Sequence, residues 1–411
     1  IGSTPPRGSF SLQPLRRAKV MINAVYTIPS IRISSAFARN CLCKMSTVTA
    51  PAVPRFIDVL DGESNSTSAS NGFRFRLVSF NILAQVYVKS SIFPHSPSPC
   101  LRWKARSQAI LSALRSLDAD FFCLQEVDLY DDFYKENMKN LGYLSIYIQK
   151  SGTKRDGCGI FYKDKSAELV LEEKIEYNDL AELAYVSTSP SGDKHNYGPD
   201  SQNKDARSED GFAPDNSTED DGDLNDPFVR LKRDCVGIMA AFKLKESSRQ
   251  VVIVANTHLY WNPELVDVKL AQANYLLSRL EQFRLLISNK FECTPSIILS
   301  GDFNSTPGDK VYQYLVSGSS SPVPPCGHSD LPLPLYSVYA FMHGEPPFTN
   351  CTPGFTGTLD YIFFSPSAQI KPVSFLQLPE PDDYDVVGGL PNYHHPSDHL
   401  PIGAEFTVNK E

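Results

Sequence analysis

Polar side chains that could bind a metal ion or move a proton stand at the ends of several apolar, strand-like segments. They are Asn81 after "LVSF", Glu126 after "FFCLQ", Asn256 and His258 in "VVIVANTH", Asp302 and Asn304 in "IILSGDFN", Asp360 before "YIFF", and Asp398 and His399 before "LPIGAEF". Taken singly, each is an ordinary turn or capping residue. Because strand ends of α/β folds converge on clefts, their repetition indicates one shared site.

The residue types favour hydrolysis assisted by a hard cation. Carboxylate and amide oxygens without thiolates suit Mg²⁺, and the nine cysteines are scattered without zinc-site spacing, so we expect free thiols. Imidazoles can donate to phosphate oxygens, and a carboxylate beside a water can act as a general base. No nucleophile elbow or Gly-rich phosphate loop is present. The pattern therefore favours direct attack of water on a metal-bound phosphodiester.

The elements that would position these residues are strands interleaved with helices. Apolar alternation or short apolar runs predict strands at 73–83, 120–127, 143–150, 158–163, 236–244, 250–259, 296–304, 359–365 and 400–408. Helical spacing predicts helices at 103–117, 131–142 and 264–283. This order indicates an α/β fold, in which helices cover two packed sheets as a two-sheet α/β sandwich. Trp103 and Arg106 are interpreted as anchors of the first helix against the sheet, with a contact near the active site as the alternative. Asp156 is interpreted as a turn residue that could line the cleft.

Charge is distributed unevenly along the chain. Residues 1–57 hold eight Lys and Arg and no acid, and residues 192–227 hold eleven acids against three bases. We predict that 1–72 is a basic, low-complexity leader and linker, either a transit peptide or a disordered segment, and that 192–227 is a disordered insertion in a domain spanning 73–411. Since these segments carry equal numbers of acids and bases, the body keeps the net charge of −8. A broad basic face for nucleic acid is therefore excluded.

Six motifs together resemble the endonuclease/exonuclease/phosphatase superfamily, whose fold is that of deoxyribonuclease I. They are "SFNIL", "LQEV", "NTHLYWNP", "SGDFNSTP", "LDYIFFS" and "SDHLP", which occur in the family's order over roughly residues 73–408. The resemblance implies that Glu126 is the principal Mg²⁺ ligand, with Asn81 beside it and Asp398 serving the metal or its water shell. Two ions are expected during catalysis, and Mn²⁺ is an expected substitute.

The resemblance also implies the catalytic roles. Asp302 would orient and deprotonate the attacking water, and Asn304 would bind the scissile phosphate. His258 and His399 would stabilise the developing negative charge. Asp360 would hold His399 in its useful tautomer, as carboxylates beside catalytic histidines commonly do.

Within the superfamily, "NTHLYWNP" and "FTGTLDYIFFS" look most similar to the carbon catabolite repressor deadenylases, which remove messenger RNA poly(A) tails. In that family an aromatic residue and a proline sandwich an adenine, and the matching positions here are Phe355 and Pro263. The resemblance implies a 3′→5′ exoribonuclease that releases 5′-AMP from poly(A) RNA. Stacking needs no basic surface, which reconciles an acidic body with an RNA substrate.

Partners and compartment follow less directly from the residues. Yeast-type members dock to an mRNA-decay scaffold through leucine-rich repeats, and no such repeat is visible here. Membership of a decay complex is thus expected only from the resemblance of the catalytic domain. We expect a monomeric core with no membrane partner, in the cytoplasm and nucleus, or in a mitochondrion or plastid if the leader is a transit peptide.

Two alternatives remain at this point. Relatives of the same fold, a nocturnin-like dinucleotide 2′-phosphatase or a 2′,5′-oligoadenylate phosphodiesterase, would share the metal site. A non-catalytic adaptor of RNA decay is the alternative of another class, and it would be expected to have lost at least one polar member of the set. All members are present.

Overall fold

The computed structural model describes residues 54–58, 72–188, 223–246, 250–317, 333–367 and 369–408. All of them fall in one compact unit, Val53–Glu411. Most of the expected leader and most of the expected acidic insertion lie outside the described residues, so both expectations stay predictions. Among the described helices, none combines the length and the apolar character needed to cross a membrane.

Two sheets form the centre of the fold. The first has the strand order β1 (Phe56–Asp58), β14 (Ile370–Leu376), β15 (Ile402–Val408), β2 (Phe73–Asn81), β3 (Phe121–Gln125), β5 (Gly157–Lys163) and β4 (Tyr143–Gln149). The second has the order β10 (Tyr336–Ser337), β13 (Asp360–Phe364), β9 (Ser296–Asp302), β8 (Val251–His258), β7 (Val236–Leu244) and β6 (Ala167–Glu176). A separate hairpin pairs β11 (Asn350–Thr352) with β12 (Phe355–Gly357).

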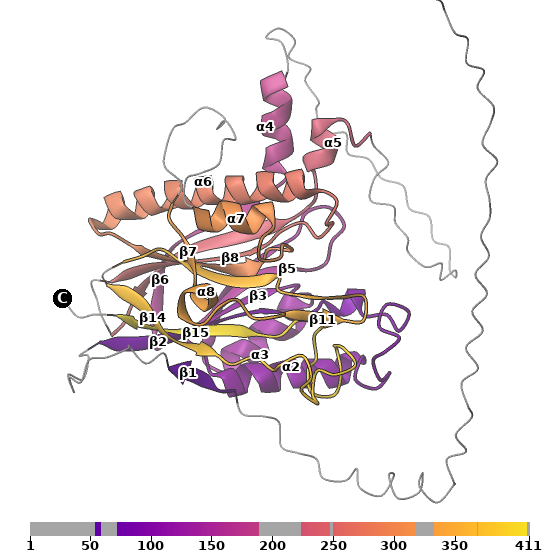
Figure 1. Cartoon of the computed structure of the whole chain (residues 1–411). Coiled ribbons are helices and arrows are strands. Elements are labelled where there is room, and N and C mark those ends of the chain that lie inside the picture. The colour runs from indigo at the N-terminus through magenta and orange to yellow at the C-terminus, as the bar shows by residue number, and fades with distance from the viewer. Residues whose placement is uncertain are drawn as a thin grey trace, which may run out of the picture. The chain divides into compact units, whose positions relative to one another are not determined.

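Helices cover the outer face of each sheet (Figure 1). The helices are α2 (Trp103–Leu117), a π-helical turn (Tyr130–Tyr134) that continues into α3 (Lys135–Asn140), α4 (Asp179–Thr188), α5 (Pro227–Leu231), α6 (Val266–Phe291), α7 (Lys310–Ser317), α8 (Val338–Met342) and the 3-10 turn Gln85–Tyr87. Side chains of α2 and α3 pack on the first sheet, and those of α6 and α7 pack on the second. A third apolar cluster fills the space between the sheets.

This layering explains the sequence pattern and confirms the predicted two-sheet sandwich. Strand β8 is apolar along most of its length because all of its residues are buried. One face of the strand packs against the first sheet, and the other face packs against α6. The amphipathic α2 buries Ile110 and Leu114 and ends at Asp118, which adopts the left-handed conformation. The six described cysteines are free thiols, as predicted.

The structure adds strands that the sequence pattern did not predict. Strand β1 lies inside the segment expected to be a leader, where Phe56–Asp58 pairs with Leu376 to Ser374 of β14. Its three residues are too few to show a period. Strand β6 is largely exposed and charged along one side, and β14 contains Pro372 next to a register shift against β15. An exposed strand at the edge of a sheet and a strand that contains proline both lack the apolar pattern from which strands are predicted.

Asn256 joins the two sheets through buried hydrogen bonds. Its Nδ2 donates to the carbonyl oxygens of Leu124 and Gly159 at 2.9 Å each, and its Oδ1 accepts from Gln125 Nε2 at 2.8 Å. Asn256 is fully buried, on β8 of the second sheet, while its partners belong to β3 and β5 of the first. This residue at a strand end is therefore an intersheet tie rather than a member of the candidate site.

We expect Asn256→Leu to lower the free energy of unfolding by about 2–4 kcal/mol, because it removes three buried hydrogen bonds between the two sheets. Urea denaturation followed by circular dichroism measures this loss. Asn140→Leu, at an exposed position of α3, is the control and should change stability by less than about 0.5 kcal/mol. Equal effects of the two substitutions would contradict the tie.

Candidate active site

Strand register brings three of the predicted residues level with one another in the second sheet. His258 of β8 lies opposite Asp302 of the parallel strand β9. Asp302 in turn lies opposite Asp360 of the antiparallel strand β13. Each of the three residues stands at the end of its strand that faces the same edge of the sheet. The pairing pattern alone therefore places an imidazole and two carboxylates in one row.

The first sheet supplies the facing side of the site. Asn81 pairs with Gln125 at the ends of β2 and β3, and Glu126 follows directly with a left-handed backbone, φ 56°. Ser397 Oγ donates to Asn81 O at 2.7 Å and accepts from the backbone N–H of His399 at 3.2 Å. The turn before β15 is thus fixed against the end of β2. This contact places His399 beside the row of His258, Asp302 and Asp360 on the second sheet.

Asp302 is the centre of the assembled site. Its side chain is almost fully buried, and its Oδ2 accepts a hydrogen bond from Asn81 Nδ2 at 3.0 Å. The same oxygen lies 3.5 Å from His258 Nε2 and 3.7 Å from His399 Nε2. Groups from both sheets therefore converge on one carboxylate oxygen.

Glu126 fits the role of a metal ligand. Its Oε1 accepts from Asn81 Nδ2 at 3.1 Å, and its Oε2 accepts from the backbone N–H of Ala84 at 3.0 Å. Burial, and next the negative charge of Asp156, raise the pKa of Glu126 to about 7. A carboxylate held ionised against burial and neighbouring acids needs a compensating cation. The Asp398 carboxylate contributes to the same negative field, so Glu126 and Asp398 could hold a divalent ion together.

Asp302, Asp360 and His399 also bring one ligand atom each within 4.8 Å of one another. However, His399 Nδ1 donates to Asp360 Oδ2 at 2.7 Å, and Thr349 Oγ1 donates to the same oxygen at 2.6 Å. The bonded Nδ1 therefore has no lone pair for a metal, and the other ring nitrogen, Nε2, faces Asp302 Oδ2 at 3.7 Å. We treat Asp360 and His399 as a carboxylate–imidazole pair beside Asp302, and we assign the metal to Glu126, whose carboxylate lies among other acids.

The two histidines differ in charge. Burial lowers the pKa of His399, but the nearby Asp360 and Asp302 carboxylates outweigh it and raise the pKa well above the usual value. Burial, and next the positive charge of Lys150, lower the pKa of His258 to about 3. At neutral pH His399 is thus a cation that can donate a proton, and His258 is a neutral ring that can donate one hydrogen bond.

Asn304 stands in the turn that follows β9, in the left-handed conformation with φ 48°. Its backbone N–H donates to Asp302 Oδ1 at 2.9 Å, and its Nδ2 donates to Leu259 O at 2.9 Å. The amide nitrogen carries a second hydrogen. Asn304 is therefore beside Asp302, as predicted, and tied to the loop after β8.

Phe355, on the β11–β12 hairpin, and Pro263, in the loop after β8, belong to segments that adjoin this site. Phe355 opens β12 with 41% of its surface exposed, and Pro263 is exposed in the loop after β8. The hairpin is bound to the site by a bridge between Asn350 and His399 and by a hydrogen bond of 3.1 Å from the backbone N–H of Cys351 to Asp398 O. Both predicted stacking residues are thus available to a substrate, and their joint contact with a base stays a prediction.

Arg106 has a larger role than the predicted helix anchor. The side chain is buried on α2, and its guanidinium donates to the carbonyl oxygens of Ile82, Leu83 and Pro396 and to Gln85 Oε1. These acceptors belong to the turn after β2, which contributes the Ala84 N–H to Glu126, and to the turn before Asp398. One guanidinium therefore connects both segments that shape the metal site.

Sequence reasoning missed a second polar cluster beside Glu126. Asp156 is fully buried, forms an ion pair with Lys150 at 2.8 Å, and accepts from Tyr87 Oη at 2.6 Å. The positive charge of Lys150 partly offsets the effect of burial and of the neighbouring acids, which together raise the pKa of Glu126. The available signal was "RDGCGIF", in which a charged residue directly precedes a buried strand. Asp156 is therefore a buried partner of Lys150, and both charges act on Glu126.

We expect Arg106→Lys to weaken Mg²⁺ binding about tenfold or more, the usual cost of losing an outer hydrogen-bonding group around a metal. Lysine keeps the charge but cannot span four acceptors from two loops. Isothermal titration calorimetry with Mg²⁺ measures the affinity. Arg115→Lys, at an exposed position of the same helix, is the matched control. Unchanged affinity in Arg106→Lys would show that Arg106 serves the helix alone.

Comparison with known proteins agrees with this geometry. Residues 78–399 match the model of the Endonuclease/Exonuclease/phosphatase family. "Carbon catabolite repressor protein 4 homolog 4" of Arabidopsis thaliana is 63% identical over 351 residues, which cover 85% of this chain and 81% of that protein. The "CCR4-Not complex 3′-5′-exoribonuclease subunit Ccr4" of Schizosaccharomyces pombe is 29% identical over 405 residues. That match covers 87% of this chain and 52% of the relative, so the chain spans about half of its length.

Solved structures extend the comparison to the fold. ANGEL2, described as a 2′,3′-cyclic phosphatase, has a TM-score of 0.62 and 25% identity, covering 88% of this chain and 100% of that one. The catalytic domain of human nocturnin has a TM-score of 0.56 and 23% identity, covering 88% and 99%, and it shows the fold alone. Together with the metal-site geometry, these matches show that the chain belongs to the endonuclease/exonuclease/phosphatase family and, within it, to the carbon catabolite repressor 4 homologues.

Proposed function

We propose that this protein is a Mg²⁺-dependent 3′→5′ exoribonuclease that shortens poly(A) tails and releases 5′-AMP. The observation that carries the proposal is the convergence on Asp302 Oδ2 of Asn81, His258 and His399, with Glu126 bound to the same Asn81 amide. A buried carboxylate beside a cation site and two imidazoles suits activation of water and stabilisation of charge on phosphate.

Each residue has a role that its contacts support. Asp302 accepts the proton of the attacking water, and its orientation is held by Asn81. His399, charged through its bond to Asp360, donates to a phosphate oxygen as negative charge grows there. Asn304 offers its remaining amide hydrogen to the phosphate. Bound Mg²⁺ supplies Lewis-acid stabilisation of the phosphate charge at Glu126.

The names of the relatives support the exoribonuclease activity, and the surface beside the site supports the preference for poly(A). The fungal relatives are named 3′-5′ exoribonuclease subunits. Phe355 presents an exposed ring on the hairpin that bridges to His399, and Pro263 is exposed after β8. Stacking of a base on such a ring contributes about 1–3 kcal/mol and does not require a basic face. The net charge of −8 is therefore compatible with an RNA substrate.

We also propose that the protein works with an mRNA-decay complex. The names of the fungal relatives place those proteins in the CCR4-Not complex, and the match to them extends over most of this chain. Co-purification of the tagged protein with decay factors, compared with the tagged Glu126→Gln variant, would test the association separately from catalysis.

A time course on 5′-labelled RNA with a 3′ A-tail tests the activity. A ladder that shortens from the 3′ end in Mg²⁺, and stops in EDTA, is the expected result. Parallel incubations contain RNA ending in a 2′,3′-cyclic phosphate, NADP and 2′,5′-linked oligoadenylate, since ANGEL2 is described as a 2′,3′-cyclic phosphatase. Turnover of one of these in place of the A-tail would replace the proposed substrate. No turnover of any would favour the adaptor.

We expect Glu126→Gln to abolish turnover while the protein stays folded. Removal of a buried charge with a raised pKa does not destabilise the metal-free protein, so its melting temperature in EDTA should equal or exceed that of the wild type. Mg²⁺ at about 100 times its Kd should stabilise the wild type by about 2.7 kcal/mol and should not stabilise the variant. Thermal melts with and without Mg²⁺ measure this, and an equal Mg²⁺ shift in both proteins would place the ion elsewhere.

We expect Phe355→Ala to cost about 1–3 kcal/mol in kcat/KM on A-tailed RNA, the scale of one stacked base. Because the metal site is untouched, hydrolysis of a small phosphodiester that does not reach the hairpin should be unchanged. Phe341→Ala is the control, since Phe341 is an exposed ring on α8 that packs on Phe364, at the far end of β13 from Asp360. If U-tailed RNA loses as much as A-tailed RNA, Phe355 does not select adenine.

A further inference from the structure

We infer that Lys269 is a positioning residue, which holds the loop after β9 so that the Asn304 side chain faces the scissile phosphate. The role of Asn304 on phosphate rests on the proposed function. The contact between Lys269 and Asn304 is a property of the fold and does not depend on that role.

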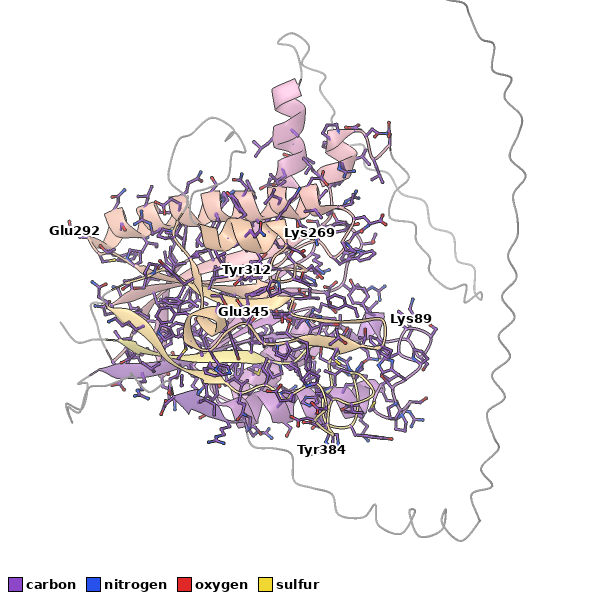
Figure 2. The ribbon with its side chains drawn as sticks, in the orientation of Figure 1. Lys89, Lys269, Glu292, Tyr312, Glu345 and Tyr384 are labelled. Carbon is purple, nitrogen blue, oxygen red and sulfur yellow. The ribbon has the colours of Figure 1, made fainter. Side chains whose placement is uncertain are left out.

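The contact is short and buried. Lys269 belongs to the first turn of α6, is 3% exposed, and its Nζ donates to the carbonyl oxygen of Asn304 at 2.7 Å. In Figure 2 its label lies just below the ribbon of α6, on the side of the sheets. Helix α6 packs on the second sheet, so this lysine reaches from the outer layer to the end of β9.

A lysine is an unfavourable residue for this position on stability grounds. Burial of an ammonium group is costly, and burial is the main cause that lowers the pKa of Lys269. The first turn of a helix carries partial positive charge, which also opposes a cation. An apolar side chain of the same length would avoid both costs. The hydrogen bond to Asn304 and the nearby negative charges of Asp309 and Asp302 offset these costs.

Three hydrogen bonds hold Asn304 in place. Its backbone is left-handed, with φ 48°, a conformation that Asn adopts more readily than most other non-glycine residues. Its N–H, its carbonyl oxygen and its amide nitrogen are bound by Asp302, Lys269 and Leu259 respectively. Among the described hydrogen bonds, none uses the second hydrogen of Asn304 Nδ2, so this hydrogen can bind a substrate oxygen. The three contacts of Asn304 fix the direction in which this hydrogen points.

The same part of α6 also holds the loop after β8. Gln272 is fully buried, and its Oε1 accepts from the backbone N–H of Tyr260 at 2.9 Å. Asn304 Nδ2 joins this loop to its own through Leu259 O. Lys269 and Gln272 therefore stand on one helix and fix two neighbouring loops that together present Asn304. This arrangement points to positioning of the site rather than to general packing.

A double-mutant cycle tests the inference. Lys269→Met keeps length and helix propensity but removes the donor. We expect it to lower kcat on A-tailed RNA about 10- to 100-fold with KM changed less than about threefold, because a catalytic group is misplaced rather than lost. Asn304→Ala removes the group that is positioned. In the Asn304→Ala background, Lys269→Met should then cost less than about threefold.

Controls separate positioning from loss of stability. Leu280→Ala truncates a fully buried side chain further along α6 and should lower the melting temperature while kcat stays within about twofold. If Lys269→Met is unfolded at the assay temperature, the cycle is repeated with Lys269→Gln, which keeps a polar end but is too short to reach the carbonyl. Losses that multiply independently in the double variant, or a wild-type kcat in Lys269→Met, would overturn the inference.

The experiment also distinguishes a wrong substrate from a wrong role of Lys269. If the wild-type protein hydrolyses RNA ending in a 2′,3′-cyclic phosphate, NADP or 2′,5′-linked oligoadenylate instead of A-tails, the same cycle is measured on that substrate. Non-additive losses there would support the positioning role and reject poly(A). Additive losses on A-tailed RNA would keep the proposed function and reject the role of Lys269.

Discussion

The structure depends on bringing donors from several elements to one buried carboxylate. Asp302 lies at the end of β9, buried between two sheets, and a buried carboxylate without hydrogen-bond donors is costly. Hydrogen-bond donors from different elements surround the Asp302 carboxylate. They are Asn81 from β2 and the Asn304 backbone from the turn after β9, with the imidazoles of His258 and His399 nearby. The two-sheet sandwich is the arrangement that lets side chains from two strand ends meet over a single oxygen. Everything else in the site orients these donors.

Much of this could be predicted because the strands are strongly apolar and the polar residues interrupt them. Asn81, Glu126, His258, Asp302, Asp360 and His399 all stand where apolar runs end, and the strand register brings His258, Asp302 and Asp360 level. The pattern could not separate members of the site from structural residues of the same type. Asn256 occupies an equivalent position, and only the placement of β3 and β5 shows that it ties the sheets together.

Residues that act across the fold could not be predicted from their local sequence. Arg106 and Lys269 stand on two different helices, and the sequence indicates a helix anchor for Arg106 and no role for Lys269. Each is buried because loops from distant parts of the chain close over it and supply carbonyl acceptors. Lys150 and Asp156 form an ion pair beside Glu126 for the same reason. Such contacts depend on how loops meet after the sheets have formed, and sequence spacing does not encode that.

Strand β15 lies inside the first sheet, between β14 and β2, although it comes late in the chain. The turn that precedes it carries Asp398 and His399, and Ser397 of this turn binds the end of β2. The edge of β2 that pairs with β15 therefore has no partner during synthesis until more than 300 further residues have been made, since β15 begins at Ile402. A nascent chain that has not yet released this segment has neither a closed sheet nor a complete set of catalytic groups. The first sheet and the site at its end are therefore completed only by the last part of the chain.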